Sequence, residues 1–227
     1  MEIVGLIPAR GGSKGIPGKN LALVAGRPLI EWTCAAATAS ATLTRCIVST
    51  DDAQIAETAR AAGIDVPFMR PAEIAQDATP MIDVVRHALD ELGSPEAIVL
   101  LQPTSPLRTH EHIDLAVRLW LTEHADSVVS VVEVPHAFTP SSLMRLTDGR
   151  LTPASSDVEP TRRQDKQQLV ARNGPAVVVT SRDTIREGSL YGADCRALAM
   201  PREASIDIDT MYDLELADYL LRRRIDG

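Results

Sequence analysis

The chain has 227 residues and a formal net charge of −8 at pH 7, which is enough chain for one large domain with a substantial core. The acidic balance argues against nucleic acid as a partner, and no stretch resembles a membrane span or a signal peptide. Three widely spaced cysteines, Cys34, Cys46 and Cys195, predict buried, unreactive thiols rather than a disulfide framework or a zinc site. We therefore expect a cytoplasmic globular protein with no membrane or nucleic-acid partner.

A loop rich in glycine and cations follows the first predicted strand, residues 3–7. Residues 7–20 read IPARGGSKGIPGKN, and their four glycines and two prolines exclude regular structure. Glycine lets the backbone approach a ligand closely, and turned N–H groups can hold an anion. Arg10, Lys14 and Lys19 add three positive charges with no acid among them, a pattern that favours a polyphosphate ligand. The alternative is a flexible surface loop with incidental charge.

Two well-known phosphate loops do not fit this stretch. A Walker loop needs a glycine five residues before its Gly-Lys pair and a hydroxyl residue after it, whereas Ser13 and Asn20 stand in those places. The dinucleotide pattern Gly-x-Gly-x-x-Gly is also absent from the sequence.

Residues 7–20 instead resemble the signature loop of the acylneuraminate cytidylyltransferase family, which activates sialic acids and related sugars as CMP derivatives. The resemblance implies that this loop binds the triphosphate of CTP. Arg70 and Asp77 follow a later predicted strand and are expected at the same site. The predicted nucleotide-binding residues are Ala9, Arg10, Gly11, Gly12, Ser13, Lys14, Lys19, Asn20, Arg70 and Asp77.

Strands and helices alternate through the rest of the chain. We expect strands at 45–49, 66–69, 97–101, 127–132 and 177–179, with a candidate edge strand at 196–200. We expect helices at 28–41, from about 51, at 80–92, at 110–123 and at 211–224. The alternation predicts a doubly wound α/β fold with a mainly parallel sheet, and the resemblance implies the nucleotide-diphospho-sugar transferase type. Asp51, three residues before Gln54, either caps the second helix or belongs to the site.

The rhythm of strands and helices breaks over residues 135–168, where apolar runs are few and prolines are frequent. We expect one nucleotidyltransferase domain over 1–227, with 135–168 as a small excursion from the sheet. In the family that the chain resembles, this excursion crosses a dimer and delivers cations to the neighbouring active site. The resemblance therefore implies a homodimer.

The strand expected at 97–101 ends in Gln102-Pro-Thr104-Ser105-Pro-Leu-Arg108, at the edge of the sheet where ligands of this fold class bind. This segment resembles a second family motif, which lies beside the acceptor sugar. The resemblance implies that Gln102, Thr104 and Ser105 contact the substrate. For Ser105, a proline-rich turn with a capping hydroxyl is the alternative.

Asp207 and Asp209 alternate with isoleucines, so both carboxylates would face one side of an extended segment. Two like charges on one face call for a cation, and hard carboxylate oxygens suit Mg²⁺ together with substrate phosphates. The resemblance likewise implies that this pair binds the metal. The alternative for Asp209 is a cap on the last helix.

A third motif resembles the family in part. Arg163-Gln164 and Arg172-Asn173-Gly174 match, but a tyrosine expected shortly after the glycine is missing. Tyr191 is the nearby aromatic candidate. The resemblance implies that Arg163, Gln164, Arg172 and Tyr191 contact the acceptor.

These features predict a Mg²⁺-dependent cytidylyltransferase that transfers CMP from CTP to the hydroxyl of an acidic sugar of the sialic acid type, releasing pyrophosphate. Arg10, Lys14, Lys19 and Asp209 are the predicted catalytic residues, and no general base is evident. One alternative keeps the fold and changes the acceptor to a legionaminic, deaminated sialic or octulosonic acid, or to a phosphonate. Another is a nucleotide-binding paralogue without turnover, against which the intact Asp207 and Asp209 argue.

Overall fold

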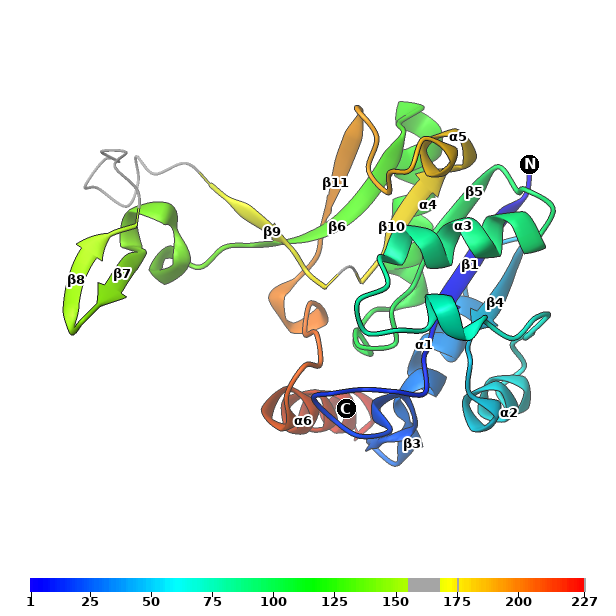
Figure 1. The fold of residues 1–227 in the computed structure, drawn as a ribbon, viewed down its shortest axis with the longest axis horizontal. Helices are drawn as coiled ribbons and strands as arrows, with labels where there is room; N and C mark the ends of the chain where they lie inside the picture. The colour runs from blue at the N-terminus through cyan, green and yellow to red at the C-terminus, as the bar shows by residue number, and fades with distance from the viewer. Residues whose placement is uncertain (155–167, 175, 227) are drawn as a thin grey trace.

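A computed structural model describes residues 1–154, 168–174 and 176–226. Seven of the described strands form one sheet in the order β11-β6-β10-β5-β1-β4, with β9 added beside β6 (Figure 1). They are β1 (Ile3–Pro8), β4 (Arg45–Ser49), β5 (Ala97–Leu100), β6 (Ser127–Glu133), β9 (Val170–Arg172), β10 (Val178–Ser181) and β11 (Cys195–Ala199). β1 is parallel to β4 and β5, and β6 is parallel to β11, whereas β10 and β9 run antiparallel to their neighbours. The predicted α/β fold with a mainly parallel sheet is confirmed.

Helices cover both faces of this sheet. One apolar cluster joins Ile7 and Val99 of the strands to Ile30, Ile55 and Ile113 of three helices. The residues that alternate with them along the strands pack against the other helices. The first face carries α1 (Leu29–Thr38), α2 (Ala53–Ala61) and α4 (His110–Glu123), and the second carries α3 (Met81–Glu91) and α5 (Arg182–Arg186).

Three sequence predictions need correction. Residues 66–69 form no strand, because only isolated bridges at Asp65 and Met69 tie this segment to the sheet. The predicted helix 28–41 ends at Thr38, and the chain beyond it turns to bind the carboxylate of Asp114 through the N–H groups of residues 41 and 42. Cys34 is buried, Cys46 is half-buried and Cys195 is exposed, so the predicted burial of all three cysteines is wrong for Cys195 and holds only in part for Cys46.

Capping of α2 is a further correction. Asp52, not Asp51, is the N-cap residue, and its Oδ1 accepts hydrogen bonds from the N–H groups of Gln54 and Ile55 at 2.8 and 3.0 Å. The Asp51 carboxylate instead accepts a hydrogen bond from the Gly11 N–H at 3.0 Å. Asp51 therefore stabilises the glycine-rich loop and not the helix.

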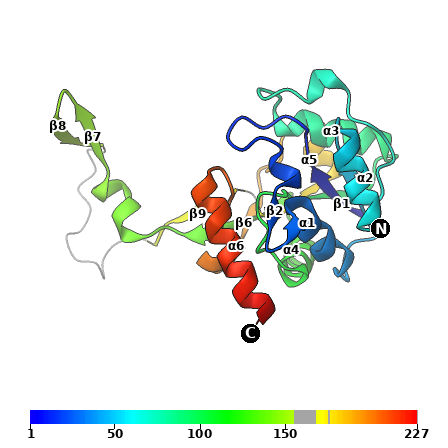
Figure 2. The same ribbon diagram turned by 90° about the horizontal axis from the view of Figure 1, so that it is seen from below.

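The C-terminal helix α6 (Met211–Asp226) lies beside the glycine-rich loop (Figure 2). A third apolar cluster joins Ala217 and Leu221 of this helix to Ile16 of the loop, to Leu107 and to Ile208. Ile16 lies between two of the loop's cations, and Ile208 lies between the two aspartates. Burial of these two isoleucines therefore fixes the loop and the aspartate segment against the same helix.

The excursion from the sheet projects away from the body as an arm (Figures 1 and 2). Its described part contains η3 (His136–Phe138), η4 (Pro140–Ser142) and a hairpin of β7 (Met144–Thr147) and β8 (Arg150–Pro153). Every residue of the two hairpin strands is exposed, including Leu146 at 71% and Leu151 at 64%. These strands therefore lack a packing partner within the described chain, although an isolated two-stranded hairpin is marginally stable at best.

None of the helices in the described parts of the chain combines the length and the apolar character needed to cross a bilayer.

Candidate active site

The glycine-rich loop leaves the carboxyl end of β1, beside the ends of β4 and β5. Ala9 is fully buried and its N–H donates to the carbonyl of Ser49, which extends the pairing of β1 with β4 by one residue. The Asn20 amide then donates to the carbonyl of Arg10 at 3.0 Å and closes the loop at its base. Gly11 approaches α2 so closely that a Cβ atom there would lie 2.6 Å from Asp52. Its own chain thus fixes the start and the end of the loop.

The middle of the loop is open to a ligand. A Cβ atom at Gly12 would meet nothing within 4 Å. The described residues give neither the Gly12 N–H nor the Ser13 hydroxyl a hydrogen-bond partner. These groups are free to bind an anion.

Two of the three cations meet at one carboxylate. Arg10 Nη1 pairs with Asp77 Oδ1, and Lys14 Nζ lies 2.8 Å from Asp77 Oδ2. Hydrogen bonds from Lys14 and then Arg10 hold the pKa of the Asp77 carboxyl below its usual value. The structure thus brings together three of the residues predicted to bind the nucleotide.

The third cation joins the loop to the aspartate segment. Lys19 Nζ donates to the carbonyl of Ile208 at 2.6 Å and lies 3.6 Å from Asp209 Oδ1. Gly15 is required at this crossing, because a Cβ atom there would lie 2.7 Å from the Asp209 carbonyl oxygen. Cations from one end of the chain and carboxylates from the other therefore share one site.

Asp207 is the more deeply buried of the two aspartates. Burial, reinforced by the charge of Asp209, raises the pKa of its carboxyl, while the nearby Thr104 side chain acts in the opposite direction. Its Oδ1 is buried without a hydrogen-bond partner in the described structure, and its side chain packs against Gly174, where a Cβ atom would overlap it. A buried carboxylate oxygen without a partner is costly unless a ligand completes it.

The aspartate pair fits Mg²⁺ by this test. Asp207 offers an unpartnered carboxylate oxygen, and Asp209 offers an exposed one. The described residues contain no group of three or more acidic, histidine or cysteine side chains that could hold a metal. Mg²⁺ needs no such group, since it commonly takes one or two carboxylates and completes its shell with water and substrate phosphates. Asp209 does not cap α6, because Thr210 and Asp213 exchange the hydrogen bonds at that helix start.

Arg70 is buried beneath the loop. Its Nε donates to the Ser49 hydroxyl at 3.1 Å, and its Nη2 donates to the Ser49 carbonyl. Burial lowers the pKa of Arg70 to about 10, against the opposing charge of Asp51. Arg70 therefore lies close to Asp51 and Arg10, and its bonds to Ser49 hold it there.

The segment after β5 contacts the aspartate segment directly. The Ile208 N–H donates to the carbonyl of Thr104 at 2.9 Å, and the Thr104 hydroxyl donates to Gln102 Oε1 at 3.2 Å. Gln102 and Thr104 are half-buried at this edge, but Ser105 is completely buried and its hydroxyl has no described partner. The structure brings Gln102 and Thr104 to the site and leaves Ser105 beneath it.

Sequence reasoning assigned no role to Arg108, which proves to be the largest fully buried side chain in this segment. Its guanidinium donates to the carbonyls of Gln102 and Ala176 at 3.1 and 2.9 Å and to the Thr33 hydroxyl at 2.6 Å. Burial lowers the pKa of Arg108 to about 10. It thus fixes the backbone that carries Gln102. The position of Arg108 at the end of the motif was the available signal, but the three acceptors come from distant parts of the chain.

Two of the predicted acceptor residues lie together on the far side of the sheet from α1. The Arg172 guanidinium stacks 4.9 Å above the ring of Tyr191, which packs against the second apolar cluster. Within residues 1–154, 168–174 and 176–226, no hydrogen bond or ion pair joins this pair to the glycine-rich loop. Arg163 and Gln164 lie outside the described residues.

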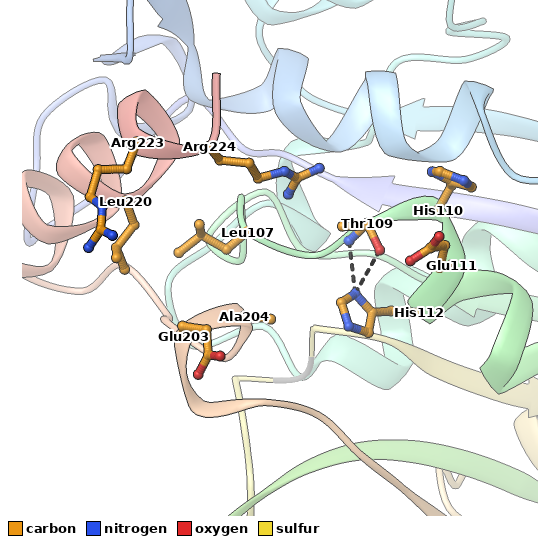
Figure 3. A pocket seen from close by; sticks show the side chains of 10 residues that line it. All are labelled: Leu107, Thr109, His110, Glu111, His112, Glu203, Ala204, Leu220, Arg223 and Arg224. Carbon is orange, nitrogen blue, oxygen red and sulfur yellow. Dashed lines mark hydrogen bonds between the residues drawn. The ribbon is translucent and has the colours of Figure 1, made fainter. Parts of the chain in front are cut away.

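A cavity of about 560 Å³ between α6 and the start of α4 lies apart from these residues (Figure 3). His112 Nδ1 accepts a hydrogen bond from the Thr109 N–H at 3.0 Å and closes a capping box at its edge. None of the residues predicted to bind nucleotide, acceptor or metal lines this cavity. Leu107 and Leu220 link it to the apolar cluster beneath the aspartates.

Comparison with known proteins identifies the family. The sequence model described as cytidylyltransferase matches residues 4–217. The chain belongs to the cytidylyltransferase family. This match, together with N-acylneuraminate cytidylyltransferase relatives at 33% and 36% identity, confirms the predicted resemblance of this cytidylyltransferase.

Two curated relatives differ in how much of them the chain spans. It is 33% identical to an N-acylneuraminate cytidylyltransferase of Escherichia coli over 95% of its own length, but spans only about half (51%) of that relative. It is 34% identical to a CMP-N,N'-diacetyllegionaminic acid synthase of Legionella pneumophila over 97% of both chains. A solved CMP:2-keto-3-deoxy-manno-octonic acid synthetase complexed with CTP has a TM-score of 0.76 at 18% identity, covering 99% of this chain and all of that one. The last match shows the fold alone.

Proposed function

We propose that this cytidylyltransferase transfers CMP from CTP to the hydroxyl of an acidic sugar of the sialic acid type and releases pyrophosphate. The contact between the glycine-rich loop and the aspartate segment carries this proposal. Through that contact, Lys19 reaches both the Ile208 carbonyl and the Asp209 carboxylate. Cations that suit a triphosphate and carboxylates that suit its metal ion then act on the same phosphate groups.

The reaction is an in-line displacement at the α-phosphorus of CTP. The acceptor hydroxyl oxygen forms a bond to that phosphorus, the bond to the bridging oxygen breaks, and pyrophosphate leaves. Such a transfer depends mainly on positioning and on charge stabilisation. Arg10, Lys14 and Lys19 hold the triphosphate and stabilise the charge that develops on it. The free N–H of Gly12 and the hydroxyl of Ser13 bind phosphate oxygens.

The remaining nucleotide residues act by fixing this loop. Ala9, Gly11 and Asn20 make the backbone contacts that hold its two ends. Arg70 lies beneath the loop and supports it, and Asp77 forms ion pairs with Arg10 and Lys14.

Asp207 and Asp209 would hold Mg²⁺. When bound, this ion supplies charge neutralisation at the phosphates and makes the acceptor hydroxyl more acidic. No side chain is assigned as general base, and the proton of the hydroxyl passes to water. Asp209, exposed beside Lys19, is the more accessible of the two carboxylates that would hold the ion.

Gln102 and Thr104 position the acceptor, because they are the half-buried polar groups nearest the aspartate segment at the end of β5. Ser105 contributes through packing. Arg163, Gln164 and the stacked pair of Arg172 and Tyr191 complete the acceptor side. The Legionella relative, whose name specifies a legionaminic acid product, is spanned nearly end to end and supports legionaminic acid as the second candidate acceptor.

The protein acts as a homodimer in this proposal. The arm exposes large apolar side chains over its whole described length, and it has no partner within the described chain. Two-fold homodimers are the commonest symmetric assembly, and a second copy would cover the arm. The exposed residues are Phe138, Leu143, Met144, Leu146 and Leu151.

A panel assay tests the proposal. Pyrophosphate release would be measured with CTP, Mg²⁺ and, in separate reactions, N-acetylneuraminic, diacetyllegionaminic, deaminated sialic and octulosonic acids and a phosphonate. We expect release with at least one acid sugar, and with the Asp209→Asn variant either no release or release only at far higher Mg²⁺ concentration. Tight CTP binding without release for any acceptor would identify a non-catalytic paralogue. The reaction with the best acceptor would be repeated with ATP, GTP and UTP, and release at equal rates from all four nucleoside triphosphates would overturn the choice of CTP.

A further inference from the structure

The Asp77 carboxylate binds the two cations in the way a phosphate group would. Its two oxygens contact different partners, with Oδ1 on Arg10 Nη1 and Oδ2 at 2.8 Å from Lys14 Nζ. These two pairs are its only polar contacts among the described residues. A phosphate bridging the same cations would need the position that this carboxylate occupies.

We propose that Asp77 is an internal counter-ion, which holds Arg10 and Lys14 when no nucleotide is bound and which the triphosphate displaces. The inference rests on the proposed function for the identity of the ligand. It goes further in assigning Asp77 a role opposite to that of a direct ligand: Asp77 competes with the phosphates for their cations.

The exposure of the three side chains makes the exchange feasible. The side chains of Arg10, Lys14 and Asp77 are 32%, 83% and 34% exposed, so none of the three ions is trapped in the interior. Exposed ion pairs of this kind are weak, and a triphosphate carries several charges against one on the carboxylate. The phosphates therefore displace the carboxylate from Arg10 and Lys14, and the carboxylate moves into solvent.

The displaced carboxylate also has a consequence for the product. Pyrophosphate leaves the same two cations, and Asp77 returns to them as it departs. The counter-ion thereby lowers the affinity of the loop for pyrophosphate. It favours product release without touching the reacting atoms.

Pyrophosphate and inorganic triphosphate are the probes that isolate this effect, since neither needs an acceptor or a cytosine site. Binding of each to wild-type protein and to Asp77→Asn would be measured by calorimetry, with CTP binding measured in parallel. The amide keeps the shape of the side chain and removes its charge. We expect about three- to tenfold tighter binding to the variant, the range given by two weak surface pairs. The affinity should also fall more steeply with salt, because the loop carries one more uncompensated charge.

Two controls separate this mechanism from a general change in charge. Glu73→Gln removes the same charge from a neighbouring exposed residue of η2 (Ala72–Ile74) that forms no described ion pair, and it should bind both probes like wild type. In a Lys14→Ala background, Asp77→Asn should tighten binding less than in wild type, because one of the two competing pairs is already gone.

The outcomes separate this inference from the proposed function. If wild type binds CTP and inorganic triphosphate but Asp77→Asn binds the probes no more tightly than wild type, the counter-ion role is wrong. Weaker binding by the variant would show instead that Asp77 helps to hold the ligand. If wild type binds neither compound, the loop is not a phosphate site, and the proposed function and this inference both fail. Equal tightening by Glu73→Gln would reduce the effect to bulk electrostatics and would also overturn the inference.

Discussion

The glycine-rich loop and the projecting arm are the two parts of this chain with no regular pattern in sequence, and the structure resolves them in opposite ways. Ile16 of the loop is buried against α6, and Asp51, Asn20 and Ser49 accept or supply its backbone hydrogen bonds. In the arm, both strands of the β7–β8 hairpin are exposed throughout. The glycine-rich loop is thus held by contacts within one chain, whereas the hairpin strands of the arm find no packing surface among the described residues.

The largest expected effect lies on the nucleotide side. Asp209→Asn should abolish turnover or require far more Mg²⁺, because a neutral amide is a poorer ligand for a hard cation. Pyrophosphate release as a function of Mg²⁺ concentration checks this. An unchanged Mg²⁺ dependence would remove Asp209 from the metal site.

A variant in the excursion tests whether the arm acts in trans. Arg163→Ala should be inactive in its own dimer, and mixing it with Asp209→Asn under subunit exchange should restore activity. Recovery should approach about a quarter of wild type, because half of the dimers are hybrids and each hybrid has one complete site. Light scattering supplies the control for assembly. A monomer would end the dimer proposal, and a dimer without recovery would place Arg163 in the site of its own chain.

A substitution of Arg10 tests the proposed nucleotide site through a smaller expected loss of rate. Arg10→Ala should lower the rate about 10²- to 10³-fold, which is the usual loss for one preorganised charge-stabilising donor. The thermal midpoint should hardly change, because this partly exposed side chain packs little apolar surface. Steady-state kinetics and a thermal melt measure both quantities. Near-normal turnover would exclude Arg10 from the site.

Two adjacent aspartates give the smallest and sharpest test of the loop's support. Asp52→Ala should cost about 1 kcal/mol of unfolding free energy, because it removes the cap of α2. That loss corresponds to roughly 2–4 °C in the melting temperature for a domain of this size. Asp51→Ala should leave the melting temperature closer to wild type and weaken CTP binding, because Asp51 holds the Gly11 N–H. The reverse pattern would contradict the assignment of the two side chains.

Much of the fold followed from sequence because local pattern and burial agree in it. The apolar run at 97–101 became β5, fully buried between the two helical layers. The strand predicted at 66–69 is wrong, because this segment has the composition of a strand but forms only isolated bridges with its neighbours. Short segments of this kind are decided by tertiary contacts that propensity does not contain.

The same distinction applies to the candidate site: local patterns were predictable from sequence, whereas contacts between distant elements were not. Cations within one loop are visible in sequence, and the structure brings Arg10, Lys14 and Asp77 together. The roles of Arg108 and Asp51 were not predictable, since each depends on partners from separate elements. For Arg108 these include Thr33, which lies 75 residues away along the chain. Asp51 and Asp52 are adjacent residues of the same type, and only their partners in the structure show that Asp51 binds Gly11 and Asp52 caps α2.

Identification of the product tests the central claim most directly. Wild-type protein would be incubated with CTP, Mg²⁺ and the acid sugar that gives the fastest pyrophosphate release, and followed by ³¹P NMR. We predict that the CTP resonances are replaced by one phosphodiester resonance of a CMP-sugar and by pyrophosphate in equal amounts. CTP that persists with every acid sugar, or free CMP and pyrophosphate without a phosphodiester, would contradict transfer to a sugar hydroxyl.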